Sequence, residues 1–150
     1  MTLTRRDVSG LVWMGYLWNA PNTVVGLIFG LGGSFRWDGE NRVFVVLGGW
    51  MAAIFARLGY AGMCVGDVVL CAFDLPTQSP KTYAHELIHA EQGRLLGPLY
   101  LPVTVLGYIW GFIVCPREAH DASPMEIWAD VASGNAARNR YLQLRRNRSK

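Results

Sequence analysis

Residues 83–92 of the chain read YAHELIHAEQ, a stretch with two histidines four positions apart. Positions four apart on an α-helix lie on one face, so the imidazoles of His85 and His89 project together. Glu86 follows His85 directly and therefore lies beside any ion that the two rings hold. This HExxH arrangement predicts a zinc site with two histidine ligands, in which Glu86 accepts a proton from the attacking water.

Start and stop signals place this motif on a helix. A Ser-Pro pair at 79–80 supplies an N-cap and a first-turn proline, and a Gly-Pro pair at 97–98 ends the pattern. A second Ser-Pro pair, at 123–124, begins another helical pattern. We therefore predict an HExxH helix over about residues 80–96 and a second helix over about 124–133.

A catalytic zinc usually has three protein ligands, and the third must come from elsewhere in the chain. The extended pattern HExxHxxGxxH would need a histidine at position 95, where Leu95 stands. Downstream candidates are His120, Asp121, Glu126 and Asp130. Glu126 and Asp130 lie four apart on one helical face, so Glu126 is the predicted third ligand. Asp130 is then placed to hydrogen-bond the far nitrogen of a ligand histidine, which fixes its tautomer.

Several of these residues have a second interpretation. Glu126 stands three residues after a serine, so its carboxylate either binds the metal or closes a capping box. His120 either stabilises the oxyanion of the transition state or lies at the surface in a polar loop. Tyr100 and Tyr108 are alternative stabilisers or packed aromatic residues. Gln92, one turn after the second histidine, is a contact of substrate or ligand, or a solvent-facing amide.

At this point the sequence resembles the gluzincin metallopeptidases, in which HExxH is followed on a later helix by Glu-x-x-x-Asp. The resemblance covers roughly residues 79–134. It implies the following roles: His85, His89 and Glu126 as zinc ligands, Glu86 as general base, and Asp130 as a support for a ligand. The segments APNTVVGL, VGDVVL, HELIHAEQ and LGPLYLP, in that order, also resemble a group of small uncharacterised bacterial HExxH proteins.

Composition points toward lipid. Hydrophobic residues make up 51% of the chain and charged residues 17%, against a usual charged share of about 25%. Residues 11–33 and 95–115 contain no charge, and each is about as long as the roughly 20 residues that cross a bilayer. Asn19, Pro21 and Asn22 interrupt the first stretch, which predicts a kinked span or two short pieces. We expect membrane association, with lipid as a partner.

The metal site constrains the second apolar stretch. If residues 95–115 crossed a bilayer as one straight helix, about 30 Å would separate His89 from Glu126, and the site could not form. The chain must therefore leave and return. A re-entrant or surface-lying hairpin and a pair of buried core segments both satisfy this requirement.

The segment between the apolar stretch and the HExxH helix has strand character. SFRW and RVFVV flank DGEN, a hairpin signal, and the apolar run 68–73 reads as a buried strand. Residues 50–58 fit a strand or a helix. We predict one α+β domain over residues 1–150, with a small, mostly antiparallel sheet at about 34–75.

Charge and cysteine content add weaker constraints. The three cysteines form no CxxC pair, which favours a reducing compartment. The net charge of +3 comes largely from a basic C-terminal tail, and it gives no reason to expect a specific nucleic-acid partner. The distribution of Arg and Lys favours a catalytic side that faces the cytoplasm. The broken apolar run at 11–33 lacks a clear cleavage site, so we do not expect a cleaved signal peptide.

Together these patterns predict a zinc-dependent metallopeptidase whose partner is a peptide or protein substrate. The alternative is a catalytically inactive, metal-stabilised module that binds a membrane or a partner. The short chain and Glu91, a charged residue where the family pattern is apolar, favour that alternative. A third interpretation is a structural membrane protein without metal.

Overall fold

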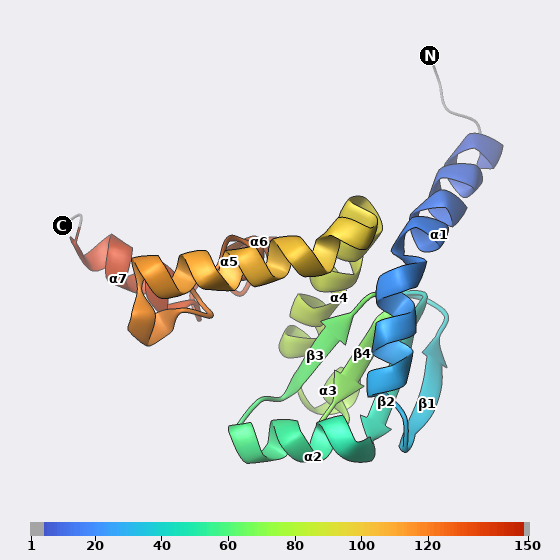
Figure 1. Ribbon diagram of the computed structural model, residues 1–150, viewed down its shortest axis with the longest axis horizontal. Helices are drawn as coiled ribbons and strands as arrows, with labels where there is room; N and C mark the ends of the chain where they lie inside the picture. The colour runs from blue at the N-terminus through green and yellow to red at the C-terminus, as the bar shows by residue number, and fades with distance from the viewer. Residues whose placement is uncertain (1–4, 149–150) are drawn as a thin grey trace.

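The computed structural model describes residues 5–148 and has an α+β fold (Figure 1). The elements in chain order are α1 (Arg5–Phe29), β1 (Gly33–Asp38), β2 (Val43–Gly48), α2 (Gly49–Leu58), β3 (Gly62–Val65), β4 (Val68–Cys71), α3 (Leu75–Gln78), α4 (Pro80–Leu96), the 3-10 turn η1 (Gly97–Leu99), α5 (Tyr100–Val114), the 3-10 turn η2 (Pro116–Glu118), α6 (Pro124–Ala132) and α7 (Arg140–Arg148). The predicted HExxH and ExxxD helices correspond to α4 and α6. Lys150, at the end of the predicted basic tail, lies outside the described residues.

The four strands form one sheet in the order β1-β2-β4-β3. β1 pairs with β2, and β3 with β4, in antiparallel register, whereas β2 and β4 run parallel. β2 and β4 run parallel because β3, which follows α2, runs antiparallel to β2, and β4 then turns back and lies between β2 and β3. The predicted α+β fold with a small, mostly antiparallel sheet is therefore confirmed. The ambiguous residues 50–58 are helical, and β3 is an additional edge strand.

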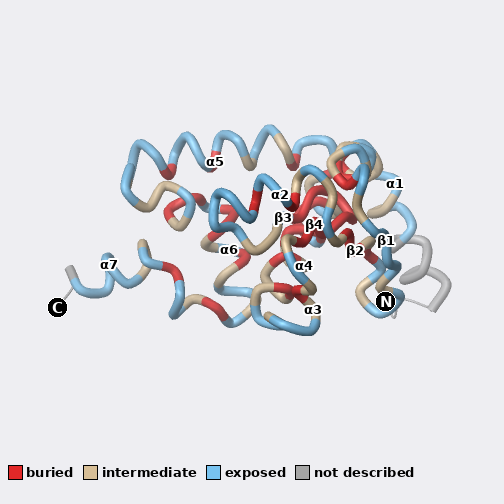
Figure 2. Tube along the Cα trace, turned by 90° about the horizontal axis from the view of Figure 1, so that it is seen from below, coloured by how far each residue is buried: buried red, intermediate tan, exposed pale blue. Residues whose placement is uncertain are grey.

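Valines from β2 and β4 form the centre of the core. Because helices cover both faces of the sheet, β4 is buried at all four positions, which is typical of a central strand (Figure 2). On one face Val45 and Val69 pack with Tyr83 and Ala90 of α4. On the other face the cluster contains Phe55 of α2, with α1 side chains against it. The HExxH helix is thus held firmly on the sheet.

The first apolar stretch forms part of one continuous helix. α1 runs through Pro21, so the two-piece interpretation of residues 11–33 is wrong. Asn19 and Asn22 are buried rather than helix-ending. The Asn22 amide donates to the Gly97 carbonyl oxygen at 2.6 Å, and its partner amide Asn19 packs on Gly93. These contacts fasten α1 to the C-terminal end of α4.

The second apolar stretch leaves the sheet and returns. By length and composition, the helical stretch Pro80–Val114 could cross a membrane. It bends at η1, where Gly97 has φ 56°, and α5 then leads through η2 into α6, which packs back on α4 and α5 (Figure 1). Gly107 and Gly111 allow this return segment to approach α5 closely. The outer side chains of α5 are exposed, so the interpretation as a buried core segment is wrong.

Candidate metal centre

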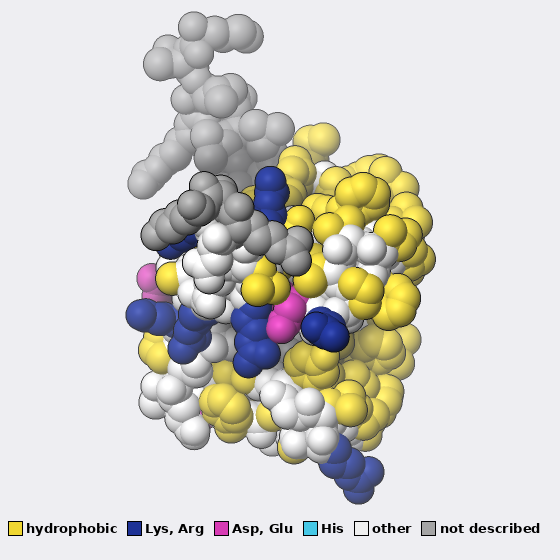
Figure 3. All heavy atoms as spheres, turned by 90° about the vertical axis from the view of Figure 1, so that its left-hand side faces the viewer, with side chains coloured by type: hydrophobic (Ala, Val, Ile, Leu, Met, Phe, Trp, Pro, Cys, Tyr) yellow, Lys and Arg dark blue, Asp and Glu magenta, His cyan; other side chains and the backbone are white. Residues whose placement is uncertain are grey.

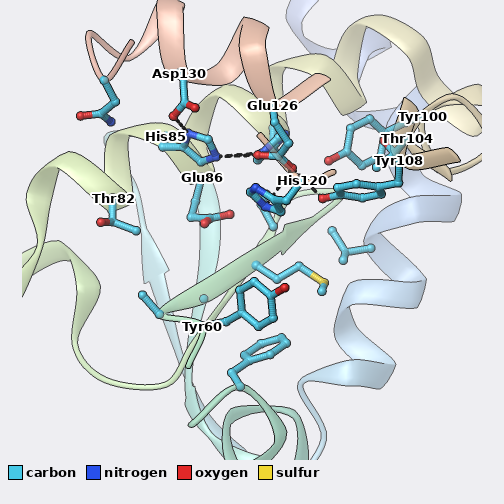
Figure 4. A pocket seen from close by; sticks show the side chains of 18 of the residues that line it. Tyr60, Thr82, His85, Glu86, Tyr100, Thr104, Tyr108, His120, Glu126 and Asp130 are labelled. Atoms are coloured by element: carbon cyan, nitrogen blue, oxygen red, sulfur yellow. Dashed lines mark hydrogen bonds and ion pairs between the residues drawn. The ribbon is translucent and has the colours of Figure 1, made fainter. Parts of the chain in front are cut away.

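α4 places the three residues of the motif as the sequence predicts. Its proline start and its glycine end enclose Pro80–Leu96, and one side of the helix lies against the sheet. His85 and His89 project from the opposite side toward α6, with ring centroids 4.8 Å apart. Glu86 lies beside them on the cavity wall and is 7% exposed (Figure 4).

Three potential ligand atoms converge between α4 and α6. The two Nε2 atoms of His85 and His89 lie 3.1 Å apart, and Glu126 Oε2 lies 3.1 Å from the first and 3.3 Å from the second. Ligands at about 2.0–2.2 Å from a tetrahedral zinc are separated by roughly 3.3–3.5 Å. The residues present therefore fit a metal ion, and they form a three-residue group that could hold one.

His85 has a carboxylate behind it. Asp130 Oδ1 lies 2.9 Å from His85 Nδ1, so the Nδ1 proton points toward α6 and Nε2 is the ring nitrogen that faces His89 and Glu126. The other oxygen of Asp130 accepts a hydrogen bond from Asn139 Nδ2 at 2.8 Å. The sequence indicated Asp130 by its spacing but gave no indication of Asn139.

His89 is supported by an amide instead. Its Nδ1 lies 2.8 Å from Gln92 Oε1, and the Gln92 amide nitrogen donates to the Met125 carbonyl oxygen at 3.0 Å. Because the amide oxygen can only accept, the proton of His89 lies on Nδ1 and Nε2 faces Glu126. Gln92 is therefore fully buried and orients His89, rather than lying in solvent.

Glu126 is directed at the histidines and not at its own helix start. Among the described residues no side-chain hydrogen bond from Ser123 caps α6, and the Ser123 hydroxyl is itself buried without a partner there. The Tyr108 hydroxyl of α5 donates to Glu126 Oε1 at 2.6 Å. Tyr108 therefore holds one carboxylate oxygen of Glu126, while the other oxygen faces His85 and His89. The position of Tyr108 in an apolar stretch gave no indication of this role.

Burial and hydrogen-bonded partners shift the pKa values of the residues in this centre. Burial lowers the pKa of His85, but the hydrogen bonds to Asp130 and Glu126 outweigh it and raise that pKa to about 10. Burial raises the pKa of Glu126, yet its two histidine partners hold it well below the ordinary value. The pKa of Glu86 is raised by burial, which His89 and His85 only partly offset. Glu86 is therefore a stronger base than a solvated glutamate.

A cavity of about 730 Å³ opens beside the three ligand atoms (Figure 4). Its walls come from α2, β3, α4, α5 and α6, and both Glu86 and Glu126 line it. His120 lies at its mouth, with Nε2 3.6 Å from Glu126 Oε1 and Nδ1 3.2 Å from Asp121. Tyr100 lies deeper and is almost fully buried. The predicted ligands, the general base, Asp130 and His120 thus all line one cavity, whereas Gln92 and Asp121 lie behind His89 and His120 and do not line it.

Comparison of the chain with models of protein families, with curated proteins and with solved structures gives no match. A function must therefore come from the chemistry of the site.

Proposed function

We propose that this chain is a zinc-dependent metallopeptidase of gluzincin-like arrangement, in which His85, His89 and Glu126 bind the metal and Glu86 is the general base. The observation that carries the proposal is the convergence of three ligand atoms within 4.8 Å of one another on the wall that Glu86 shares. The order of the ligands, HExxH and then Glu-x-x-x-Asp on a later helix, supports the same family resemblance.

The donor set supports zinc over other common cations. Two imidazole nitrogens and one carboxylate oxygen suit zinc, whereas Mg²⁺ and Ca²⁺ prefer oxygen ligands throughout. Each histidine has its Nδ1 proton fixed by a hydrogen-bond acceptor, so both Nε2 atoms face the metal position, and metal binding displaces the proton that His85 carries there. Three protein ligands beside an open cavity also leave room for water and substrate, which is typical of a catalytic site.

Zinc, when bound, lowers the pKa of water to about 7 and polarises a carbonyl group. Glu86 takes the proton of the attacking water and delivers it to the leaving amine nitrogen, so the amine departs neutral. Burial suits this role because it raises the pKa of the Glu86 carboxyl. The base is thereby placed nearer to the neutral range in which it must both accept and release a proton.

His120 is the best-placed donor for the substrate carbonyl oxygen. The Tyr108 hydroxyl is occupied by Glu126, whereas His120 Nε2 faces the same region from the cavity mouth. In its protonated form His120 keeps Nδ1–H toward Asp121 and offers Nε2–H to the developing oxyanion.

The open cavity also argues against the alternative, a catalytically inactive, metal-stabilised module. A structural zinc site is closed by a fourth protein ligand and leaves no space for a reactant. Here a volume of about 730 Å³ adjoins the ligand atoms, and Glu86 lines it without belonging to the ligand group.

The test compares the Glu86→Gln variant with Glu91→Gln, the same change at an exposed position on the same helix. Zinc content is measured by elemental analysis, and hydrolysis is measured with fluorescently labelled casein and a quenched peptide library. We expect Glu86→Gln to keep stoichiometric zinc and to lose at least about a hundredfold in rate. The Glu91→Gln variant should keep both zinc and rate.

Two results would contradict the proposal. If the Glu86→Gln variant hydrolysed these substrates as fast as the wild type, Glu86 would not be the general base. A wild-type protein that binds zinc but cleaves none of these substrates would favour the inactive metal-stabilised module.

A further inference from the structure

The described part of α1 has the polarity of a helix that faces lipid. Its buried side carries Asn19, Asn22 and Gly26, which are polar or small, and the buried Gly30 directly follows the helix. Its exposed side carries large apolar residues: Trp13, Met14, Leu17, Trp18, Val24 and Ile28. A helix on a water-soluble protein shows the opposite distribution, with its apolar stripe turned to the core. Small and polar residues toward the protein interior are the pattern of membrane helices.

α5 repeats this inverted polarity. Tyr100, Gly107 and Gly111 are its buried residues, and Thr104 lies on the same side. The outward side chains are large and apolar: Val105, Leu106, Ile109, Trp110, Phe112 and Ile113. The two glycines are already in close contact with the return segment, so they serve packing within this chain.

α2 completes one apolar face, which we call the α1–α2–α5 face. Trp50, Ile54 and Leu58 are its exposed large hydrophobic residues. Seen from below, α5 runs along the upper edge of the molecule, α2 and α1 also lie in the upper half of the view, and α3 and α7 lie in the lower half (Figure 2). Among the described side chains of α1, α2 and α5, the sole charge is that of Arg57.

Most charged side chains that Figure 3 shows lie away from this face. Viewed from the left of Figure 1, hydrophobic side chains gather along one side, and most of the Lys and Arg side chains in view lie on the other (Figure 3). Four of the six tryptophans are exposed on the α1–α2–α5 face: Trp13, Trp18, Trp50 and Trp110. Tryptophan favours the interface between lipid and water, and Arg57 at the end of α2 and Arg117 after α5 suit anionic headgroups.

The cavity of the metal centre opens at this same face. Tyr60, Met63, Val105 and Tyr108 line the cavity and are also exposed. Tyr60 follows α2 and Met63 belongs to β3, whereas Val105 and Tyr108 belong to α5, so these residues lie at the margins of the face. The side of the cavity mouth that these residues form is therefore largely apolar, whereas the exposed side chains of His120 and Arg138 line other parts of the cavity.

We propose that the α1–α2–α5 face docks flat on a lipid bilayer, and that the cavity opening there takes apolar peptide segments from the lipid. Docking of this face on the bilayer does not depend on hydrolysis, whereas the assignment of a peptide as the ligand of the cavity rests on the proposed function. α5 has 15 residues and is about 22 Å long, too short for a hydrocarbon core of about 30 Å. α5 also crosses the direction of α1, so the two cannot both stand upright in one bilayer (Figure 1). The face therefore lies in the interface.

Docking is tested by flotation of the full-length, zinc-loaded chain with vesicles of phosphatidylcholine alone or mixed with phosphatidylglycerol. The wild type should float with both and more completely with the anionic mixture. Ile109→Glu and Ile113→Glu, which add a charge to the α1–α2–α5 face, should lower vesicle binding by about tenfold or more while zinc content is unchanged. Leu144→Glu, the same kind of change on exposed α7, is the matched control and should float as the wild type does. A wild type that stays with the aqueous fraction overturns the proposal.

The opening to lipid is tested with vesicles whose acyl chains carry a photoactivatable diazirine. Crosslinks mapped by mass spectrometry should fall on α5 and at Tyr60 and Met63, and not on α7. A protein that floats but crosslinks elsewhere overturns the placement of the cavity mouth.

The substrate class is tested by binding, so that it does not depend on turnover. Zinc-loaded Glu86→Gln protein on vesicles is titrated with a fluorescent apolar peptide and with a polar peptide of equal length. Preferential binding of the apolar peptide, lost on substitution of Val105 by Glu, supports the proposal. Equal binding of both peptides overturns the substrate class. Vesicle docking and apolar binding by a wild type that hydrolyses nothing would refute the proposed function alone.

Discussion

The hydrogen bond between Asp130 and His85 offers the sharpest test of the metal centre. In the wild type both carboxylate oxygens accept hydrogen bonds, whereas Asp130→Asn turns one of them into an amide nitrogen. Oδ1 faces His85 Nδ1 at 2.9 Å, and Oδ2 accepts from Asn139 Nδ2 at 2.8 Å. The new amide nitrogen therefore opposes either the Asn139 donor or the His85 proton. In the second case His85 must move its proton to Nε2, where it blocks the metal.

Loss of such a support typically lowers metal affinity by about 10- to 100-fold, which is about 1.4 to 2.8 kcal/mol. We expect Asp130→Asn to fall in this range, measured as the dissociation constant of zinc in competition with a chromogenic chelator. Asp74→Asn, at a surface ion pair with Arg36 that is remote from the centre, is the matched control and should leave the constant unchanged.

The double variant Asp130→Asn with Asn139→Asp exchanges the two groups. The amide oxygen at position 130 can then accept from His85 while the amide nitrogen donates to the carboxylate at position 139, so part of the lost affinity should return. Recovery remains partial because Asn139 also donates to the Asp121 carbonyl oxygen at 3.0 Å. An unchanged zinc affinity in the single Asp130→Asn variant would refute the reasoning.

Further outcomes follow from other contacts of the metal centre and of the packing between α1 and α4. Tyr108→Phe removes the hydroxyl that holds Glu126 Oε1 and should weaken zinc binding by about 10-fold, with the fold intact by circular dichroism. Zinc should bind more tightly as pH rises from 6 toward 9, because in the metal-free protein His85, with a pKa of about 10, holds a proton that zinc must displace. That proton stabilises the metal-free fold fully below about pH 6.5, and this contribution is lost as pH rises to about 10. The gain in melting temperature on adding zinc should therefore increase with pH over this range. A gain that does not change with pH would contradict this. Gly93→Ala places a Cβ 2.7 Å from Asn19 Oδ1 and should destabilise the chain by about 1–3 kcal/mol in thermal denaturation.

Local spacing was enough to predict α4 and α6, since each begins at a Ser-Pro pair and carries its site residues four apart. The same logic failed in α1. Asn19, Pro21 and Asn22 are residues that commonly end helices, but the Asn22 amide is satisfied by the distant Gly97 carbonyl oxygen. Local preference is overridden there by a tertiary contact that no local pattern records.

The three ligand residues could be predicted from the sequence, but the residues that hydrogen-bond to the centre from other segments could not. Glu126 could be selected because it lies four residues before Asp130 on one predicted helical face. The roles of Tyr108 and Asn139 depend instead on how α5 and the segment before α7 fold back. Residues 50–58 stayed ambiguous because α2 is apolar on its exposed side as well as its buried side, which erases the helical period.

The bend at Gly97 also determines how far the fourth helix may extend. Its backbone, at φ 56° and ψ −135°, belongs to a region that side-chain-bearing residues rarely adopt, and a Cβ there would lie 2.1 Å from the indole nitrogen of Trp18. Without this hinge, the 35 residues Pro80–Val114 would continue as a single rod of about 52 Å. Such a rod would carry α6 beyond reach of the imidazoles, so one glycine, remote from every ligand, keeps the two halves of the centre within the same molecule.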